Sequence, residues 1–199
     1  TLSLSASSLQ ENSGTTLTLT ATASESVASD TTVNLSFSGD ATSGTDYSVA
    51  SSSITILSGS ATGTTTISLT DDSVYEGNES ITISTSSITG DSEYTSSSPT
   101  ASFTILENDS APVITMSAAS STITENSGSN IVLTFTSSQV SDEDITISLA
   151  TSGTSTAGTD YSSLSNVTIS ANSTSNTLNF TPTDDSIYEG DETAIISID

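Results

Sequence analysis

Apolar residues alternate with Thr and Ser along much of this chain. Leu17, Leu19 and Ala21 occupy every second position of one segment, and Ile81 and Ile83 do the same in another. A period of two buries one face of a segment and leaves the other in water, which is typical of strands in antiparallel sheets. Thr also suits the pleated backbone because its Cβ is branched. The predicted strands lie near residues 15–23, 31–37, 53–57, 63–70, 80–86 and 100–106, after an irregular first strand around residues 2–10.

Three segments occur twice in the same order, which indicates a tandem repeat of one domain type. The segments at residues 11–14, 44–47 and 71–79 recur at residues 125–128, 158–161 and 184–192. Turn-forming residues and Pro112 separate the two copies. We therefore predict one domain at residues 1–111 and another at residues 112–199. Several short strands within a long repeat favour a Greek-key β-sandwich over a solenoid.

The second copy reaches its end at Asp199 without a counterpart of the predicted strand at residues 100–106. We expect a longer parent protein, since the chain has no initiator Met, leader or long apolar run. Three outcomes are open for the missing strand. The parent chain continues and supplies it, a neighbouring copy donates a strand and builds a filament, or the terminus is frayed.

The composition excludes many kinds of binding partner and functional site. The chain has 24 Asp and Glu residues, no Lys, Arg, His or Cys, and a net charge of −24. Nucleic acids and anionic membranes are poor partners because both require basic surfaces. Catalytic triads, disulfides and ordinary zinc sites are excluded by the missing residue types. The low apolar content would permit disorder, but the strict alternation argues for a folded all-β chain.

The acids concentrate in the stretch at residues 71–79 and its repeat at residues 184–192. Since the chain has no cationic side chain, a bound cation is the natural counter-charge. Carboxylates, hydroxyls and carbonyls are ligands for hard cations, calcium above all. The simpler alternative is that the acids keep a Ser- and Thr-rich surface soluble. The tyrosines at positions 47, 161, 75 and 188 are interpreted as packing residues.

These motifs resemble the Calx-beta repeat, the immunoglobulin-like module of sodium/calcium exchangers and of very large bacterial surface proteins. The resemblance is carried by Glu-Asn-x-Gly, Gly-Thr-Asp-Tyr, Asp-Asp-x-x-Tyr-Glu-x-x-Glu and a final Ile-Leu-Glu-Asn-Asp, and it spans nearly the whole chain. It implies two tandem immunoglobulin-like sandwiches and calcium bound by carboxylates. The implied ligands are Glu11, Asp46, Asp71, Asp72, Glu76, Glu79, Glu107 and Asp109 in the first copy, and Glu125, Asp160, Asp184, Asp185, Glu189 and Glu192 in the second. The triplet Asp-Asp-Ser departs from the acidic triplet of the family and leaves the number of ions open.

The topology of a Greek-key sandwich independently places the acidic residues of the first copy at one end of the domain. Loops after the first, third and fifth strands lie at one end, together with the exit of the last strand. Glu11, Asp46, the stretch at residues 71–79 and Glu107 belong to these segments in turn. The acidic residues 142–144 of the second copy are expected to face this end, so that calcium would stiffen the junction between the copies.

The predicted function is that of a calcium-binding structural or adhesive segment in a long extracellular or cell-surface protein. Its predicted partners are the neighbouring repeats of the same chain, with strand exchange between copies as an alternative. A chain without Lys or Arg also resists trypsin-like proteases, which suits a secreted scaffold. A ligand-binding adhesin module is a second interpretation. Hydrolysis of glycosides by paired carboxylates is a third, but the chain has no Trp to hold a sugar, and we predict that it is not an enzyme.

Overall fold

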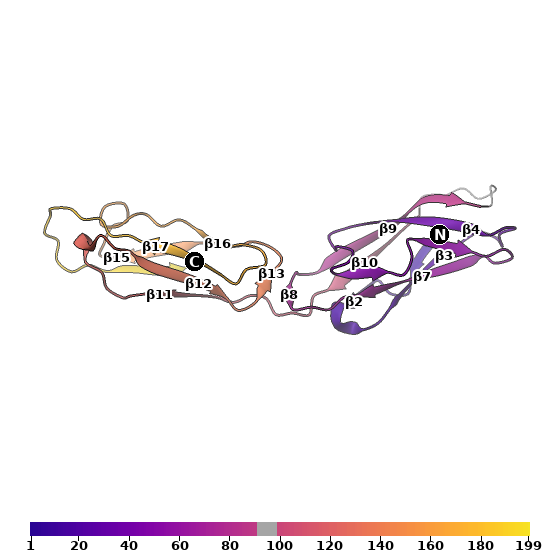
Figure 1. Ribbon diagram of the computed structural model, residues 1–199, viewed down its shortest axis with the longest axis horizontal. Coiled ribbons are helices and arrows are strands. Elements are labelled where there is room, and N and C mark those ends of the chain that lie inside the picture. The colour runs from indigo at the N-terminus through magenta and orange to yellow at the C-terminus, as the bar shows by residue number, and fades with distance from the viewer. Residues whose placement is uncertain (91–98) are drawn as a thin grey trace. The chain divides into compact units, whose positions relative to one another are not determined.

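The computed structural model describes residues 1–90 and 99–199, which form two compact units (Figure 1). The first unit comprises Thr1–Asp72 and Glu76–Asn108, and the second comprises Ser73–Tyr75 and Asp109–Asp199. Apart from two 3-10 turns, all their regular secondary structure is β-strand, so the predicted all-β class is confirmed. Among the described residues, no helix has the length and apolar character needed to cross a membrane.

Two sheets build the first unit as an immunoglobulin-like sandwich. In spatial order, the first sheet contains β1 (Leu2–Leu4), β3 (Leu17–Thr22), β7 (Thr62–Leu69) and β5 (Tyr47–Val49). The second contains β2 (Ser8–Gln10), β10 (Thr100–Leu106), β9 (Glu79–Thr89), β4 (Thr31–Ser38) and β6 (Ser53–Ile56). All the pairs are antiparallel except β2 with β10, which is parallel. The irregular first strand is thus two short strands, one in each sheet.

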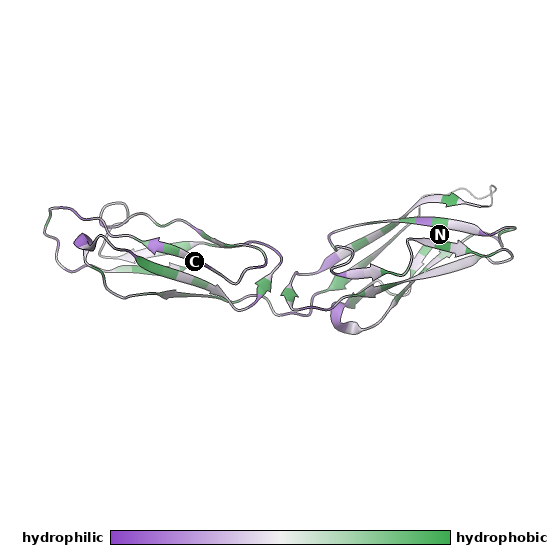
Figure 2. Cartoon of the chain, in the orientation of Figure 1, coloured by the Kyte–Doolittle hydropathy of each residue, from purple (hydrophilic) through white to green (hydrophobic). Residues whose placement is uncertain are grey.

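The core lies between the two sheets, where the alternating apolar residues meet. Leu17 and Leu19 come from one sheet and Ile81, Ile83 and Phe103 from the other, and all five are essentially inaccessible to water. Hydrophobic residues follow the strands, whereas the most hydrophilic stretches lie in turns and at strand ends (Figure 2). Burial of such side chains is the main favourable term for folding. The apolar residues that alternate with a period of two in the sequence are therefore those on the inner faces of the sheets.

The second unit repeats this plan in shorter pieces. Its first sheet contains β11 (Ile114–Ala118), β12 (Ile131–Ser137) and β17 (Ser175–Phe180). Further pairs are β14 (Ile145–Ile147) with β16 (Val167–Ile169), and β15 (Leu149–Gly153) with β18 (Ala194–Ile198). A short parallel pair joins β8 (Val74–Tyr75) to β13 (Val140–Ser141).

Strand β4 has a counterpart that is split in two. In the first unit, the pairing of β4 with β9 shifts register between Asn34 and Leu35. In the second unit the corresponding position is Ser148, where β14 ends and β15 begins. A bulge interrupts the hydrogen-bond ladder and bends the strand, and the same local irregularity divides the strand completely in the second unit.

The second unit contains no counterpart of β10 within its described residues, as the sequence predicts. There β18 pairs with β15 alone, and residues 122–124, which correspond to β2, form no strand. The core is less well covered as a result. Ile83 of β9 is 0% exposed, whereas its counterpart Ile196 is only half-buried and the adjacent Ile195 is 58% exposed.

The predicted packing role of the tyrosines holds only in part. Tyr47 and Tyr161 are buried, and the ring of Tyr161 packs against that of Phe180 at a tilt of 31°, with centroids 4.8 Å apart. Tyr188 is 96% exposed, so the prediction that it packs is wrong. Its loop has no neighbouring strand among the described residues to lie against.

Candidate cation site

The turn after β2 brings Glu11 to the end of the first unit's second sheet. Residues Glu11–Ser13 form a single 3-10 turn, which ends at Gly14 with a left-handed φ of 61°. A residue without Cβ adopts this conformation at little cost. Because β10 runs parallel to β2, Glu107 leaves the sheet next to Glu11, and carboxylate oxygens of the two residues lie within 4.8 Å. Glu11 is buried, with 5% of its surface exposed. Asp109, two residues after Glu107, already belongs to the second unit.

Asp46, Glu76 and Glu79 form what we call the first carboxylate group, with one oxygen of each residue within 4.8 Å of the others. Asp46 is buried in the turn before β5. Its Oδ2 accepts a hydrogen bond from the backbone N–H of Thr42 at 2.5 Å. Its carbonyl oxygen accepts another from Thr70 N–H at 2.9 Å. The turn is therefore fixed to the end of β7, while Glu76 and Glu79 approach from the loop that leads into β9.

Glu107 ties this loop to the exit of β10. Its Oε2 accepts hydrogen bonds from the backbone N–H groups of Glu76 at 2.7 Å and Gly77 at 2.8 Å. In return, the backbone N–H of Glu107 donates to Oδ1 of Asn78 at 3.0 Å. Hydrogen bonds to an ionised carboxylate are stronger than those between neutral groups. Glu107 therefore acts here as an acceptor that shapes the acidic loop.

Two asparagines that the sequence interpretation missed help to hold this end together. Besides the contact of Asn78 with Glu107, Asn108 donates from Nδ2 to Oδ1 of Asp71 at 3.3 Å. Its own Oδ1 accepts from the backbone N–H of Asn12 at 3.2 Å. The usable signal was their position next to acidic residues, because an amide can donate a hydrogen bond to a carboxylate and a second carboxylate cannot.

The second carboxylate group consists of Asp160, Glu189 and Glu192, again with one oxygen of each within 4.8 Å of the others. These residues occupy the same positions of the repeat as Asp46, Glu76 and Glu79. Asp160 is held in the same way, since its Oδ2 accepts from Thr156 N–H at 2.6 Å and its carbonyl from Thr183 N–H at 2.9 Å. Glu189 and Glu192 are exposed. The geometry thus recurs where the sequence recurs.

The crowding of like charges is visible in the second group. The pKa of Glu189 lies above its usual value, through partial loss of solvation and through the negative charges of Asp160, Asp185, Glu192 and Glu125. The pKa of Glu192 is raised too, by partial loss of solvation, by the charge of Asp160 and by a hydrogen bond with it, and by the charge of Glu125. Full ionisation of the group is therefore unfavourable unless a positive charge joins it.

The remaining predicted ligands lie outside the two carboxylate groups: Asp71, Asp72, Glu125, Asp184 and Asp185. Asp71 accepts from Asn108, and Oδ1 of Asp185 accepts from Ile187 N–H at 2.7 Å. Glu125 begins a 3-10 turn equivalent to that of Glu11, but it is exposed. Their role as ligands stays a prediction.

The chemistry of both groups fits calcium. Three carboxylates offer oxygen atoms only, and calcium binds about 6–8 oxygens, with carbonyl groups and water able to complete the set. Thiolate and imidazole, which favour zinc or copper, are absent from the sequence. The residues that would hold the ion in the first unit are Asp46, Glu76 and Glu79.

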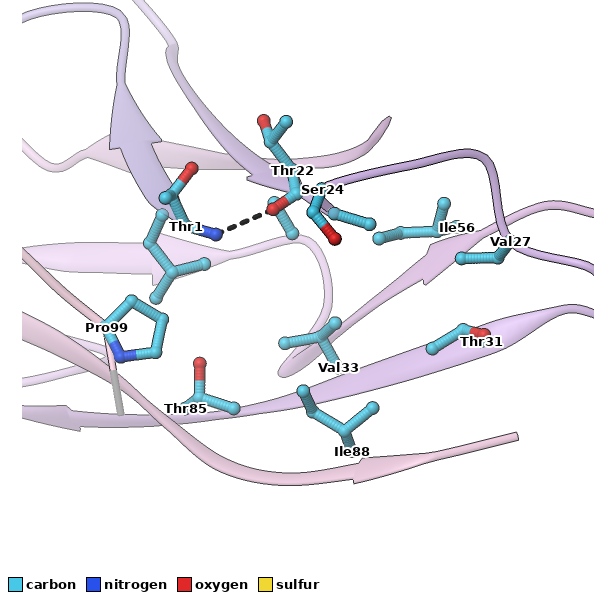
Figure 3. Close-up of a pocket in the computed structure, with 13 residues that line it drawn as sticks. Thr1, Thr22, Ser24, Val27, Thr31, Val33, Ile56, Thr85, Ile88 and Pro99 are labelled. Atoms are coloured by element: carbon cyan, nitrogen blue, oxygen red, sulfur yellow. Dashed lines mark hydrogen bonds between the residues drawn. The ribbon is translucent and has the colours of Figure 1, made fainter. Parts of the chain in front are cut away.

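A cavity of about 350 Å³ lies elsewhere in the first unit (Figure 3). Apolar side chains such as Val33, Ile56 and Ile88 line it, and the N-terminal ammonium of Thr1 donates to the carbonyl of Thr22 at 2.6 Å beside it. None of the described residues that line it is acidic. The cavity is therefore separate from the carboxylate groups.

Comparison with known proteins identifies the repeat. The family described as the Calx-beta domain matches residues 1–110 and again residues 107–199. No curated protein sequence matches the chain.

Several solved structures are similar to this chain. The crystal structure of CBD12 from CALX1.2 is 18% identical, covers 88% of this chain and 71% of its own, and has a TM-score of 0.43. Calcium binding domain CBD12 of CALX1.1 is 18% identical, with 90% and 74% covered and a TM-score of 0.43. The D0-D1 domain of Intimin is 17% identical, with 92% and 85% covered and a TM-score of 0.35.

Proposed function

The chain belongs to the Calx-beta family, and on that premise we propose that it is a calcium-binding structural segment of an extracellular protein. Calcium would bind at the first and second carboxylate groups and neutralise their charge. Its role is mechanical, because the ion would join the turn before β5, the acidic loop and the start of β9 in one rigid end of the sandwich. We propose no catalytic activity.

The observation that carries this proposal is the recurrence of one carboxylate group in both units. Asp46 lies far along the chain from Glu76 and Glu79, and the equivalent residues of the second unit converge in the same way. Three carboxylates within 4.8 Å of one another repel each other, and this arrangement occurs at equivalent positions in both units. The chain has no Lys, Arg or His to balance them. A divalent cation offsets the repulsion most directly.

The extracellular location and the tandem role are part of the same proposal. Weak sites, with dissociation constants of roughly 10⁻⁴–10⁻³ M, are typical of extracellular calcium modules, where calcium is abundant. In an array of such repeats, calcium at the domain ends would make each end stiff and limit motion at the junctions. The absence of Lys and Arg protects such a scaffold from trypsin-like proteases.

The proposal is tested by calorimetric titration of the full 199-residue chain with calcium and with magnesium. We expect calcium to bind and to raise the melting temperature, since a ligand at about 100 times its dissociation constant stabilises the folded state by about 2.7 kcal/mol. Magnesium should bind more weakly because it dehydrates reluctantly and demands stricter geometry.

Matched variants show which of the two carboxylate groups produces the heat of calcium binding. Asp46→Asn should remove binding in the first unit, and Asp160→Asn in the second, because the amide keeps the hydrogen-bonding oxygen but loses the charge. Glu25→Gln and Glu143→Gln remove one charge from each unit outside the groups and should leave binding intact. Equal calcium binding by all four variants, or a melting curve that EDTA does not change, would refute the proposal.

A further inference from the structure

We propose that the cavity of the first unit binds a small neutral molecule with an apolar body and one hydroxyl group, such as a phenol or an alcohol. The hydroxyl of the ligand would pair with Oγ1 of Thr85 in the cavity wall. In Figure 3 this oxygen points toward the space that the labelled side chains surround. The site is distinct from both carboxylate groups.

The cavity is large enough for such a molecule. Its volume is about 350 Å³, within the range of about 300–1,000 Å³ that is usual for small-molecule sites. An apolar cavity of about 150 Å³ in a protein core already binds benzene. Val33, Ile56 and Ile88 form part of the wall, and Ser24, which also lines the cavity, is exposed. The cavity therefore combines an apolar interior with access from solvent.

One polar atom of the wall lacks a partner. Oγ1 of Thr85 is buried and makes no hydrogen bond with any described residue. A bulge in β9 places it there, because Thr85 lies opposite Leu35 of β4 while Ser87 lies opposite Asn34, with one additional residue of β9 between them. Bulges redirect side chains. A buried hydroxyl without a partner is unfavourable, so a ligand that supplies the hydrogen bond gains affinity at this point.

The second unit has larger apolar side chains at equivalent positions. Ala21 lies opposite Leu2 in the first unit, whereas Phe135 lies opposite Met116 in the second and is 0% exposed. Two further positions have Thr in the first unit and Ile in the second: Thr31 with Ile145, and Thr85 with Ile198. The cavity therefore arises from small and polar side chains inside the first core, and the same fold is also built with bulkier residues there.

The charge of the chain favours a neutral occupant. A net charge of −24 repels anions. None of the described side chains that line the cavity is acidic, so a cation finds no counter-charge there. Burial of an unpaired charge in an apolar site is costly in either case.

The cavity is also far from the first carboxylate group. Ala21 at the cavity lies opposite Gly63 of β7. Tyr47, which follows Asp46 in the chain, lies opposite Leu69 of the same strand. Six residues of a strand span about 20 Å. Calcium at the carboxylates and a neutral ligand in the cavity would therefore not compete, and the two proposals can fail separately.

The test uses the full chain in EDTA, with 2-naphthol and 1-octanol as probes of different shape. The methyl NMR signals of Val33, Ile56 and Ile88 should shift saturably with either probe. The signals of Ile147 and Ile169, which are the counterparts of Val33 and Ile56 in the second unit, should not shift. The anion 2-naphthoate has the same rings and should bind about tenfold more weakly or less, because it would bring an unpaired charge into an apolar site.

Thr85→Val keeps the shape of the side chain but removes its hydroxyl. It should weaken the binding of 2-naphthol about three- to tenfold. Naphthalene, which has the same rings without a hydroxyl, should keep or gain affinity for this variant. Without a probe, the variant should melt at the same temperature as the wild type or higher, since a buried hydroxyl without a partner is removed. Thr64→Val, at an exposed position of β7, is the matched control and should change neither affinity.

Ala21→Phe introduces the residue that the second unit has at this position, and it should abolish the binding of both probes. Unchanged protection of the β3 and β9 amides from hydrogen exchange would show that the variant is folded. Thr85→Ile makes a smaller change of the same kind, and it gives the answer if Phe does not fit.

Saturable shifts at the cavity methyl groups, with a selective loss of 2-naphthol affinity in Thr85→Val, support the site. Absence of saturable shifts with both probes overturns it, as does binding that all the variants retain. Equal affinity for 2-naphthol and 2-naphthoate overturns the assignment of a neutral ligand. An equal loss for naphthalene in Thr85→Val overturns the hydrogen bond to Thr85.

Discussion

The carboxylate of Glu107 accepts a hydrogen bond from the backbone N–H of Glu76 at 2.7 Å. The chain leaving β10 therefore holds the loop that carries part of the first carboxylate group. Gly77 N–H donates to the same oxygen, with a left-handed φ of 78° at that glycine. The segment that completes the sheet therefore also holds the acidic loop in place.

Glu107→Ala should destabilise the first unit and weaken calcium binding there. Hydrogen bonds to a charged group contribute about 1.5–3 kcal/mol each in protected sites, and Glu107 is only half-buried, so we expect a total loss of about 2 kcal/mol. Scanning calorimetry with and without calcium measures both effects. Glu107→Gln keeps an accepting oxygen and should lose less, and Glu25→Ala is the control for charge. Unaltered calcium affinity in Glu107→Ala would show that the loop does not depend on Glu107.

Glu79→Gln should change stability in opposite directions with and without calcium. In EDTA the substitution removes one of three crowded negative charges, so the first unit should melt at the same temperature as the wild type or slightly higher. In saturating calcium a ligand is missing, and the variant should melt at a lower temperature than the wild type. Asp30→Asn lies outside the group and should show no such crossing. A lower melting temperature in both conditions would indicate a structural role for Glu79 instead.

The strands were predictable because burial imposes a period of two, and Leu17, Leu19, Ile81 and Ile83 display it in full. The convergence of Asp46 with the acidic loop followed from the repeat and from Greek-key topology. Short β5 was missed, since three residues are too few to show a period. The grouping of Glu76 and Glu79 apart from Asp71 was also missed. It follows from the conformation of the loop backbone, which hydrogen bonds with Glu107 hold in the first unit and which the spacing of acids along the chain does not encode.

Ile83→Ala and Ile196→Ala form a matched pair that probes how well each core is closed. Truncation of a fully buried Ile costs about 2–5 kcal/mol, because it combines lost burial with a cavity. Ile83 is 0% exposed, so the first unit should lose an amount in this range. Ile196 is half-buried, so the second unit should lose about 1 kcal/mol or less.

Denaturant unfolding of the two variants measures this difference. Equal losses for the two variants would mean that Ile196 is as well covered by its core as Ile83 is.

The stability of the second unit should depend on pH with opposite signs in the absence and presence of calcium. The pKa values of Glu189 and Glu192 are raised above the usual 4.5 in the folded unit, by partial loss of solvation and by Asp160 and neighbouring acids. A raised carboxyl pKa means that the folded state binds protons more tightly than the unfolded state. Without calcium, these two groups should therefore make the unit more stable as the pH falls from 7 through the raised pKa values toward 4.5. With calcium bound, protons compete for the same oxygens, and the same fall in pH should reduce stability.

The double variant Glu189→Gln with Glu192→Gln should lose both trends, whereas Glu143→Gln should keep them. Thermal melts at several pH values in EDTA and in calcium measure the two slopes, and slopes of the same sign in the two conditions would contradict a shared site for protons and calcium.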